Sequence, residues 1–310
     1  MKKLEELQLN EIIKADRAKL FEIFSKIESI KEKNNLQKVK TCAIINAKSG
    51  RCSEDCSFCA QSSHYKTEIQ KFPLKEPEEI LNFAKNFDKK AKRFSIVTSG
   101  KGINSKEEKR KILKAVELIR ENTNLNCCVS IGIIDKNFLK DLKKAGVTGF
   151  HHNLETSRSF FKNICTTHDY EEDVKMVEIA KEEGFYVCSC GIFGIGENWQ
   201  HRFELAETLK NLDVDSLPIN FLTPIKGTPL QGKRSLNPIE CLKIIAFFRV
   251  IFPTKDIRIC GGREYNLRQL QNLIFSAGAN GIMIGNYLTT KGRKIEDDFE
   301  MIKDLGLEIE

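Results

Sequence analysis

VKTCAIINAKSGRCSEDCSFCAQSS, residues 39–63, joins a short apolar run to a polar loop that carries three cysteines. The run at 39–45 has the length and β-branched content of one buried strand. The loop follows directly, at the carboxyl end of that strand, where α/β barrel enzymes keep their reactive side chains. The order of strand and loop therefore indicates an α/β fold with a site above its first strand.

Seven further apolar runs of similar length continue this pattern. They occupy residues 93–99, 126–133, 147–154, 185–193, 215–222, 256–262 and 280–285. Charged stretches with helical periodicity separate them, among them 105–121, 170–183, 200–211, 238–250 and 264–277. Eight strands alternating with helices predict a (β/α)8 TIM-type barrel with parallel strands and right-handed connections.

The two ends of the chain are predicted to be helical additions to the barrel. Ile13, Leu20, Phe24 and Ile27 recur at helical spacing before a polar break. We therefore expect an N-terminal helical extension at 1–36, the barrel at 37–290 and a C-terminal helix at 291–310 that packs on it.

Composition limits the class of protein. Of the 310 residues, 41% are hydrophobic and 30% charged, as in ordinary soluble domains. The net charge of +7 comes from 50 basic and 43 acidic residues that are interspersed, so no basic patch for nucleic acid is expected. No run approaches the ~18 apolar residues of a membrane span. Eleven cysteines without an export signal favour thiolate chemistry in the cytoplasm over a disulfide framework.

Alternation along the strands predicts which side chains enter the barrel, because successive residues point to opposite faces. The outward set is Phe94, Ile96, Cys127, Val129, Ile131, Ile133, Phe150, Leu154, Val187, Ile257 and Ile259. The inward set is Arg93, Ser95, Val97, Cys128, Ser130, His151, Asn153, Glu155, Cys188, Cys190, Arg258 and Cys260. Barrels are usually filled by branched aliphatic side chains, and a buried polar group without a partner costs about 1 to 3 kcal/mol. We therefore expect the lumen to hold a metal cluster and a polar substrate.

Cys52, Cys56 and Cys59 have the spacing C-x3-C-x2-C, which admits several kinds of site. A structural zinc site needs a fourth ligand, for which His64 is available, and normally uses C-x2-C pairs. Inert packing is unexpected in so polar a loop. A [4Fe-4S] cluster that only carries electrons takes four thiolates, so three leave one iron open to a small molecule.

The loop resembles the radical S-adenosylmethionine superfamily, whose pattern CxxxCx(aromatic)C is met by Cys52, Cys56, Phe58 and Cys59. The resemblance implies that the open iron binds the amino and carboxylate groups of S-adenosylmethionine. One electron from the cluster would then yield methionine and a 5′-deoxyadenosyl radical.

Within the superfamily, residues 38–308 resemble the biotin synthase family. The similarity lies in seven blocks in the family's order: 52–67, 151–157, 164–170, 188–197, 218–230, 261–266 and 277–292. It implies radical sulfur insertion into dethiobiotin to form biotin, with the sulfur taken from an auxiliary iron–sulfur cluster. It also implies an electron donor such as flavodoxin or ferredoxin, iron–sulfur assembly machinery, and a homodimer.

By the same resemblance, Cys128, Cys188 and Arg258 match three ligands of the family's [2Fe-2S] cluster. The fourth position, a cysteine in the family's second strand, is Ser95 here, and a neutral hydroxyl is a poor ligand beside thiolates. We expect instead that Cys128, Cys188, Cys190 and Cys260 hold a rearranged auxiliary cluster, either [2Fe-2S] or a four-iron variant. The alternatives are a [2Fe-2S] site with Ser95 as a weak ligand, or loss of the second cluster.

The resemblance assigns further positions. Asn153 and Glu155 match contacts to substrate and ribose, Asn220 matches a dethiobiotin contact, and Arg93 matches a cavity residue. Gly194 and Gly196 would lie beside the adenosyl group. From the residues alone, His151 has no assigned role, Cys42, Cys127, Cys165 and Cys241 are interpreted as packing thiols, and His168 and His201 as surface or capping histidines.

Two other functions compete. One is another small-substrate radical enzyme, such as a hydrogenase-maturation or methylornithine-forming protein. The second is a non-catalytic iron–sulfur electron carrier, which a three-ligand site fits poorly.

Overall fold

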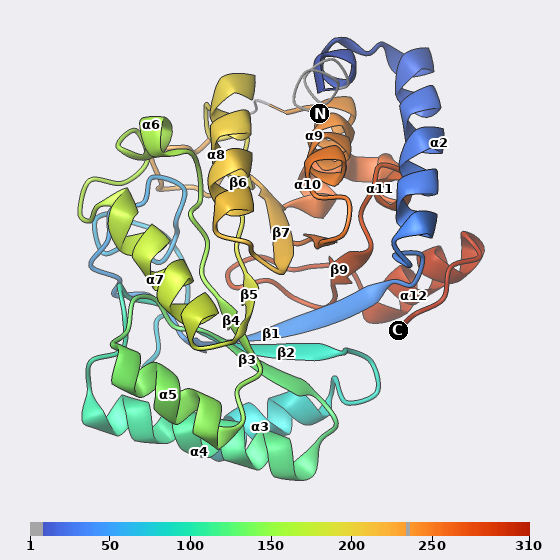
Figure 1. Cartoon of the computed structure of the whole chain (residues 1–310). Coiled ribbons are helices and arrows are strands. Elements are labelled where there is room, and N and C mark those ends of the chain that lie inside the picture. Colours follow the sequence, from blue (N-terminus) through green and yellow to red (C-terminus); the bar gives the residue numbers. More distant parts are fainter. Residues whose placement is uncertain (1–8, 234–235) are drawn as a thin grey trace.

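A closed ring of eight parallel strands forms the centre of the molecule, and helices surround it (Figure 1). This computed structural model describes residues 9–233 and 236–310. The barrel strands are β1 Lys40–Lys48, β2 Arg93–Thr98, β3 Asn126–Ser130, β4 Gly149–His151, β5 Tyr186–Cys188, β7 Ser216–Phe221, β8 Asp256–Ile259 and β9 Gly281–Met283. Neighbours along the chain pair in parallel, β1 pairs with β9, and a β5–β7 pairing completes the ring. A barrel strand forms at each of the eight predicted runs, and the barrel is confirmed.

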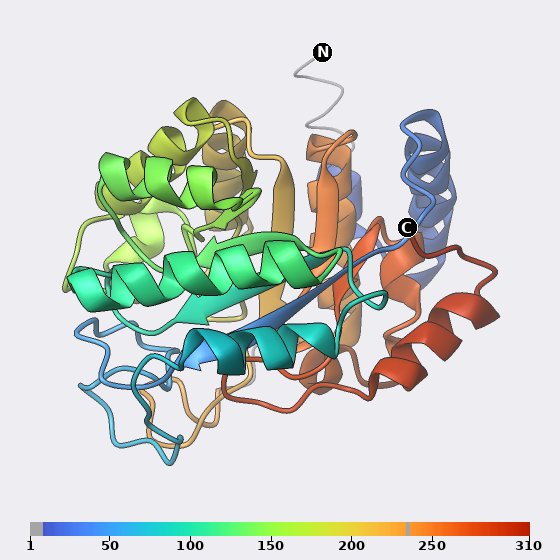
Figure 2. The same cartoon turned by 90° about the horizontal axis from the view of Figure 1, so that it is seen from below.

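The helices lie outside the ring, as the view turned by 90° also shows (Figure 2). They are α2 Arg17–Lys33, α3 Pro77–Lys85, α4 Lys106–Asn122, α5 Lys136–Ala145, α6 Arg158–Phe161, α7 Tyr170–Glu182, α8 Trp199–Asn211, α9 Pro238–Ile251, α10 Arg263–Leu267, α11 Leu273–Ser276 and α12 Ile295–Asp304. Local sequence sets their ends: Ser105 and Asp135 accept N-cap hydrogen bonds at the starts of α4 and α5.

The single helix predicted at 264–277 is wrong. This stretch forms α10, a short 3-10 turn at Arg268–Leu270, and α11. Arg268 has a φ of 50°, outside the helical region, so the continuous hydrogen-bond ladder stops there. The apolar spacing persists across the break, which is why periodicity alone suggested one helix.

The run 185–193 does not form one strand. After β5 ends at Cys188, the backbone leaves the ladder and re-enters it as β6 Ile192–Phe193, which pairs only with β7. Gly191 passes so close to the segment after β4 that a Cβ there would lie 2.3 Å from the Glu155 carbonyl oxygen. Strict alternation is therefore lost after Cys188.

Side-chain burial on β1 shows the two faces of the barrel wall. Thr41, Ala43 and Ile45 are buried beneath the helices, whereas Cys42 and Ile44 face the lumen and are partly exposed to its cavities. The side chains predicted to face the lumen also do so on β2 and at β8, where Arg93, Ser95 and Arg258 line the cavities. Ile133, predicted to face outward, lines the cavity instead, because β3 ends at Ser130.

The C-terminal helix α12 is held to the barrel by a buried ion pair. Both guanidinium nitrogens Nη1 and Nη2 of Arg263 donate to the Asp298 carboxylate, at 2.9 and 2.8 Å. The chain then returns to β1, where the Val39 amide donates to the Glu308 carbonyl. The predicted boundaries at 36/37 and 290/291 stay a prediction. No helix in the described ranges has the length and apolar character needed to cross a membrane.

Asp298→Ala should lower the free energy of unfolding by about 3 kcal/mol, because it leaves a buried guanidinium without its partner. Chemical denaturation of the cluster-free protein measures this. Asp304→Ala, at an exposed position of the same helix, is the control and should change stability by less than about 0.5 kcal/mol. Equal effects of the two substitutions would contradict the assignment.

Candidate active site

A cavity of about 420 Å³ opens at the carboxyl ends of the barrel strands. Its wall combines the loop after β1, the ends of β2 to β4, and the segment 287–290. Of the predicted site residues it contains Cys52, Cys56, Phe58, Cys59, Asn153, Glu155, Asn220 and Cys260. Residues far apart in the sequence therefore meet where barrel enzymes bind substrates.

The loop that carries the three cysteines has a defined backbone conformation. Gly50 and Arg51 both have positive φ, and a Cβ on Gly50 would lie 2.7 Å from the Lys71 Cγ. Gln61 accepts from the Gly50 amide through its side chain and from the Cys52 amide through its carbonyl. The Cys59 amide donates to the Cys56 carbonyl at 2.9 Å. These bonds fix the backbone on both sides of each cysteine.

The segment before α7 holds the same loop from outside the barrel. The Ser57 amide donates to the Ile164 carbonyl at 2.8 Å. The Asp55 carboxylate accepts from the amide and the hydroxyl of Thr166. Although partial burial raises the pKa of Asp55, these hydrogen bonds bring it below its ordinary value. The carboxylate is therefore charged at neutral pH and keeps the two segments together.

The donor set of this loop fits an iron–sulfur cluster with three protein ligands. Cys52, Cys56 and Cys59 are free thiols, and all three line the cavity. Burial raises the pKa of Cys59 to about 11, so its thiolate is disfavoured unless a cation compensates it. Iron supplies that positive charge.

Asn153 and Glu155 lie side by side at the end of β4. The Asn153 amide group Nδ2 donates to the Glu155 carboxyl at 3.3 and 3.4 Å, while its Oδ1 accepts from the Cys190 amide. Glu155 has a φ of 62°, and burial raises the pKa of its carboxyl to about 8. Such a group can both donate and accept near neutral pH, which suits a ligand rich in hydroxyl groups.

Asn220 lines the same cavity on β7 and is held by its neighbours. Its Oδ1 accepts from the Gly261 amide at 3.0 Å and its Nδ2 donates to the Pro218 carbonyl. Gly194 and Gly196 do not belong to the cavity wall. Their amides donate to the Glu197 carboxylate, in the turn that leads from β6 to α8.

A second, smaller pocket of about 40 Å³ lies deeper in the barrel and adjoins the first. Ile44, Ser95, His151, Cys260 and Met283 line both. Four cysteines, Cys42, Cys128, Cys188 and Cys260, converge on the deep pocket with Arg93 and Arg258.

Charged groups surround the deep pocket, and Arg258 is paired with Asp256, which lies outside the pocket lining. The Arg258 guanidinium lies 3.3 Å from the Asp256 carboxylate and 3.9 Å from the Cys188 sulfur. The Arg93 Nη1 lies 3.7 Å from the Cys128 sulfur. Two guanidinium groups thus face four thiols, an arrangement that compensates thiolate charge.

Unsatisfied polar groups indicate that the deep pocket is built for an occupant. Among the described residues, the Ser95 hydroxyl and the Arg258 Nε are buried without a hydrogen-bond partner. A Cβ on Gly149 would lie 2.7 Å from the Cys128 sulfur, so a glycine is required beside that thiol. The convergent thiols and these polar groups fit a second iron–sulfur cluster.

Two expectations about cysteines need correction. Cys190 lines neither cavity and packs in the hydrophobic core, because the strand breaks after Cys188. Cys42, interpreted as a packing thiol, faces the deep pocket, whose wall it shares with Cys260. Cys42 lies between Thr41 and Ala43, which are both buried on the helix side of β1. Alternation along this strand would therefore have predicted that Cys42 faces the lumen.

His168 is not a surface histidine, and Cys165 is not merely a packing thiol. His168 is buried between the carboxylates of Glu54 and Asp173, and the Cys165 sulfur lies 3.3 Å from its Nδ1. Glu54 belongs to the loop of the three cysteines. Glu54 and His168 are 114 positions apart in the chain, and the sequence patterns used above did not indicate that they meet.

Comparison with protein families agrees with this fold and site. Residues 47–209 match the Radical SAM superfamily model, and residues 218–308 match the Biotin and Thiamin Synthesis associated domain. Fold and loop thus define a radical S-adenosylmethionine enzyme.

Within that superfamily the chain belongs to the biotin synthase family. It is 51% identical to the biotin synthase of Geotalea uraniireducens over 298 residues, 96% of this chain and 91% of that protein. Its identity to the biotin synthase of Geobacter metallireducens is 52% over 290 residues, 93% and 88% of the two chains.

Two solved structures illustrate the similarity of the fold. Methylornithine synthase superposes with a TM-score of 0.86 at 19% identity, covering 99% of this chain and 94% of that one. The FeFe-hydrogenase maturase HydG from Carboxydothermus hydrogenoformans gives 0.80 at 14% identity, covering 98% and 79%. At these identities the similarity shows the fold alone.

Glu155→Gln should reduce the pH dependence of stability in the cluster-free protein. The pKa of Glu155 is raised to about 8 in the folded state, so between roughly pH 4.5 and 8 the folded state keeps a proton that the unfolded chain has lost. Stability is thus present at low pH and falls as the pH rises through that window, by roughly 1 to 3 kcal/mol.

Denaturation at pH 5 and pH 8.5 measures the effect. The variant should lose less stability than the parent between the two values. Glu207→Gln, at an exposed position on α8, should leave the profile unchanged. A profile of Glu155→Gln that matches the parent would contradict the raised pKa.

Proposed function

We propose that the chain forms biotin from dethiobiotin by radical sulfur insertion, with S-adenosylmethionine as the radical source and an auxiliary iron–sulfur cluster as the sulfur donor. The observation that carries the proposal is the adjacency of two thiol sets in one barrel. The three cysteines of the loop line the outer cavity, and four cysteines surround a deep pocket that shares five lining residues with it.

The outer site is proposed to bind a [4Fe-4S] cluster through Cys52, Cys56 and Cys59, with S-adenosylmethionine on its open iron. When bound, this group supplies a 5′-deoxyadenosyl radical that removes hydrogen atoms from unactivated carbon. Phe58 lies in the same wall, and Asn153 and Glu155 present polar groups to the nucleotide. Gly194 and Gly196 lie outside the cavity wall. They could affect nucleotide binding only through the turn that the Glu197 carboxylate holds in place.

The deep site is proposed to bind the auxiliary cluster through Cys42, Cys128, Cys188 and Cys260. Cys42 takes the place expected for Cys190, since it faces the pocket and Cys190 does not. The Arg258 guanidinium pairs with Asp256, and a protonated guanidinium has no lone pair for iron, which favours a counter-charge role. The alternative is a [2Fe-2S] cluster on Cys128, Cys188 and Arg258 with Ser95 as a weak ligand.

Dethiobiotin is proposed to lie between the two sites. Ile44 and Met283 give this level of the barrel apolar walls, and Asn220 and His151 supply polar groups. Arg93 lies deeper, beside Cys128. A substrate here would touch the radical source on one side and the sulfur source on the other, which is the proximity that the reaction needs.

We also propose a cytoplasmic homodimer that receives electrons from a flavodoxin or ferredoxin and clusters from assembly machinery. Eleven free cysteines and two oxygen-sensitive cofactors favour a reducing compartment.

Anaerobic incubation with dethiobiotin, S-adenosylmethionine and a reductant tests the activity. We expect 5′-deoxyadenosine, methionine and biotin. Formation of 5′-deoxyadenosine without biotin, while another small substrate is consumed, would favour a methylornithine-forming or hydrogenase-maturation activity. A chain that reduces its cluster but never cleaves S-adenosylmethionine would be an electron carrier.

Cys42→Ala and Cys260→Ala should each abolish biotin formation and lower the iron and sulfide content, because each removes a proposed auxiliary ligand. Cleavage of S-adenosylmethionine should stay within about threefold of the parent, since the outer site is untouched. Iron, acid-labile sulfide and both products are measured on the same anaerobic samples.

Cys190→Ala and Cys241→Ala are the matched controls, since both thiols are buried and neither lines the deep pocket. Full iron content and unchanged biotin yield in Cys42→Ala would contradict its assignment. About four irons per parent chain would contradict a second cluster. About six would indicate that the second cluster has two irons, and about eight that it has four.

A further inference from the structure

A single carboxylate on helix α7 contacts two separate parts of the proposed active site. Asp173 lies near the start of α7, and each of its two oxygens faces a histidine. The His152 Nε2 lies 2.8 Å from the Asp173 Oδ1, and the His168 Nε2 lies 3.2 Å from its Oδ2. Asp173 therefore connects the end of β4 with the segment that precedes α7.

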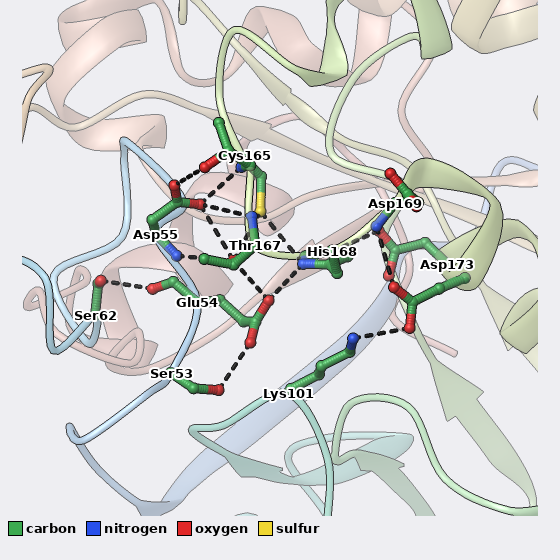
Figure 3. A network of polar contacts seen from close by, with 12 residues as sticks. Ser53, Glu54, Asp55, Ser62, Lys101, Cys165, Thr167, His168, Asp169 and Asp173 are labelled. Carbon is green, nitrogen blue, oxygen red and sulfur yellow. Dashed lines mark hydrogen bonds and ion pairs between the residues drawn. The ribbon is translucent and has the colours of Figure 1, made fainter.

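His168 continues this connection into the loop of the three cysteines. Figure 3 shows Glu54, His168 and Asp173 in one network of polar contacts. The His168 Nδ1 lies 2.6 Å from the Oε2 of Glu54, which belongs to the cysteine loop. Glu54 also accepts from the Thr167 hydroxyl at 2.7 Å. The loop is thus joined to α7 through one imidazole.

His152 continues the connection into the wall that faces the nucleotide. It directly precedes Asn153, and residues 152–154 form neither helix nor strand. Asn153 in turn donates to the Glu155 carboxyl. Burial raises the pKa of Glu155, and the nearby Asp173 carboxylate raises it further. Asp173 is thus linked to both polar residues that are proposed to contact S-adenosylmethionine.

The whole connection is enclosed, and its members line the outer cavity. The side chains of Glu54, His168, Asp173 and His152 are 9, 9, 8 and 10% exposed. Burial raises the pKa of Asp173, but its hydrogen bonds with the two histidines bring it below the ordinary value. A charged carboxylate that is buried must keep its donors, because water does not replace them. Asp173 therefore holds both imidazoles in place.

We propose that Asp173 is a positioning residue for S-adenosylmethionine. It holds the nucleotide-facing wall at a fixed position relative to the cysteine loop, through His152 on one side and through His168 and Glu54 on the other. This proposal rests on the proposed function, because it requires S-adenosylmethionine to bind both a cluster on the loop and the polar groups of the wall.

The expected effect follows from the two attachment points of the ligand. A molecule that is held at an iron and at a nucleotide contact binds tightly only when the protein keeps these two points at the matching separation. The hydrogen bonds act in series, so loss of any one of them releases the wall from the loop. We therefore expect weaker binding with little change in turnover at saturating S-adenosylmethionine.

The substitutions separate the hydrogen bonds from the charge of Asp173. Asp173→Asn keeps the shape of the side chain but has one oxygen instead of two, so it accepts from only one imidazole. His152→Phe removes the bond to the wall, whereas His152→Gln keeps a donor near the position of Nε2. Both His152 variants retain the Asp173 charge, so a difference between them reports the hydrogen bond and not the charge that acts on Glu155.

Glu178→Gln is the matched control for the change at Asp173. Glu178 lies on the same helix, its side chain is 44% exposed, and it pairs with Lys175 one turn away. The substitution removes one carboxylate charge from α7 without touching the connection.

The experiment uses the reconstituted full-length protein under anaerobic conditions. With the cluster left oxidised, no electron is available for cleavage, and equilibrium dialysis against labelled S-adenosylmethionine gives the Kd. With reductant and dethiobiotin added, the formation of 5′-deoxyadenosine gives KM and kcat. Iron content is measured on every sample.

We expect full iron content in every variant. Asp173→Asn and His152→Phe should each raise the Kd and the KM for S-adenosylmethionine about tenfold and leave kcat within about threefold of the parent. The double variant should bind no more weakly than the weaker single variant, because contacts in series are not additive. His152→Gln and Glu178→Gln should match the parent.

A second measurement needs no cluster. In the cluster-free protein, Asp173→Asn should speed hydrogen–deuterium exchange in two segments, residues 52–63 and 152–155, because both lose a partner on α7. Exchange on β7, which the connection does not reach, should be unchanged. Glu178→Gln should leave exchange in all three segments as in the parent.

Unchanged S-adenosylmethionine binding in cluster-loaded Asp173→Asn would overturn the proposal. So would equal losses in His152→Phe and His152→Gln, additive losses in the double variant, or a fall in kcat at unchanged KM. If Asp173→Asn fails to load iron, the two His152 variants decide. A parent chain that carries a cluster but binds no S-adenosylmethionine refutes the proposed function, whereas hydrogen exchange still tests the connection between the two segments.

Discussion

Thiols and guanidinium groups enclosed in one barrel lumen are the constraint on which this structure depends. Cys42, Cys128, Cys188 and Cys260 meet Arg93 and Arg258 below the main cavity. In an ordinary barrel these positions hold branched aliphatic side chains whose burial stabilises the fold. Here the stabilising apolar surface lies outside the ring, where Ala43, Ile45 and their counterparts pack beneath the helices. The lumen is thereby left for chemistry.

The outer site depends on a different kind of support. The loop from Gly50 to Gln61 has no regular secondary structure and is fixed by hydrogen bonds to its own backbone and to residues 164–168. Asp55 and Glu54 both contact that segment, where Asp55 accepts from Thr166 and Glu54 pairs with His168. The two carboxylates of the loop are thus paired with hydrogen-bond donors of that segment, which limits their repulsion of nearby thiolates.

Much of this arrangement could be predicted from the sequence because strands alternate. The rule placed Cys128, Arg258 and Cys260 correctly, and it failed at Cys190, where the strand is interrupted by a close approach to Glu155. Cys42 satisfied the same rule on β1 and could have been found by applying it there. Cys165 and His168 could not, because their partner Glu54 is brought to them only by the fold. Local pattern reports which way a side chain points within a regular element, but not which distant group it will meet.

The pairing of β1 with β9 has a consequence for how the protein is made. Cys42 and Ile282 are neighbours in space but 240 residues apart in the chain, so the ring stays open on the ribosome until nearly the whole polypeptide has emerged. During that interval the lumenal thiols have no complete enclosure. The deep pocket is open through the β1–β9 seam until the last strand closes the wall, whereas in the finished barrel it is reached through the outer cavity that adjoins it.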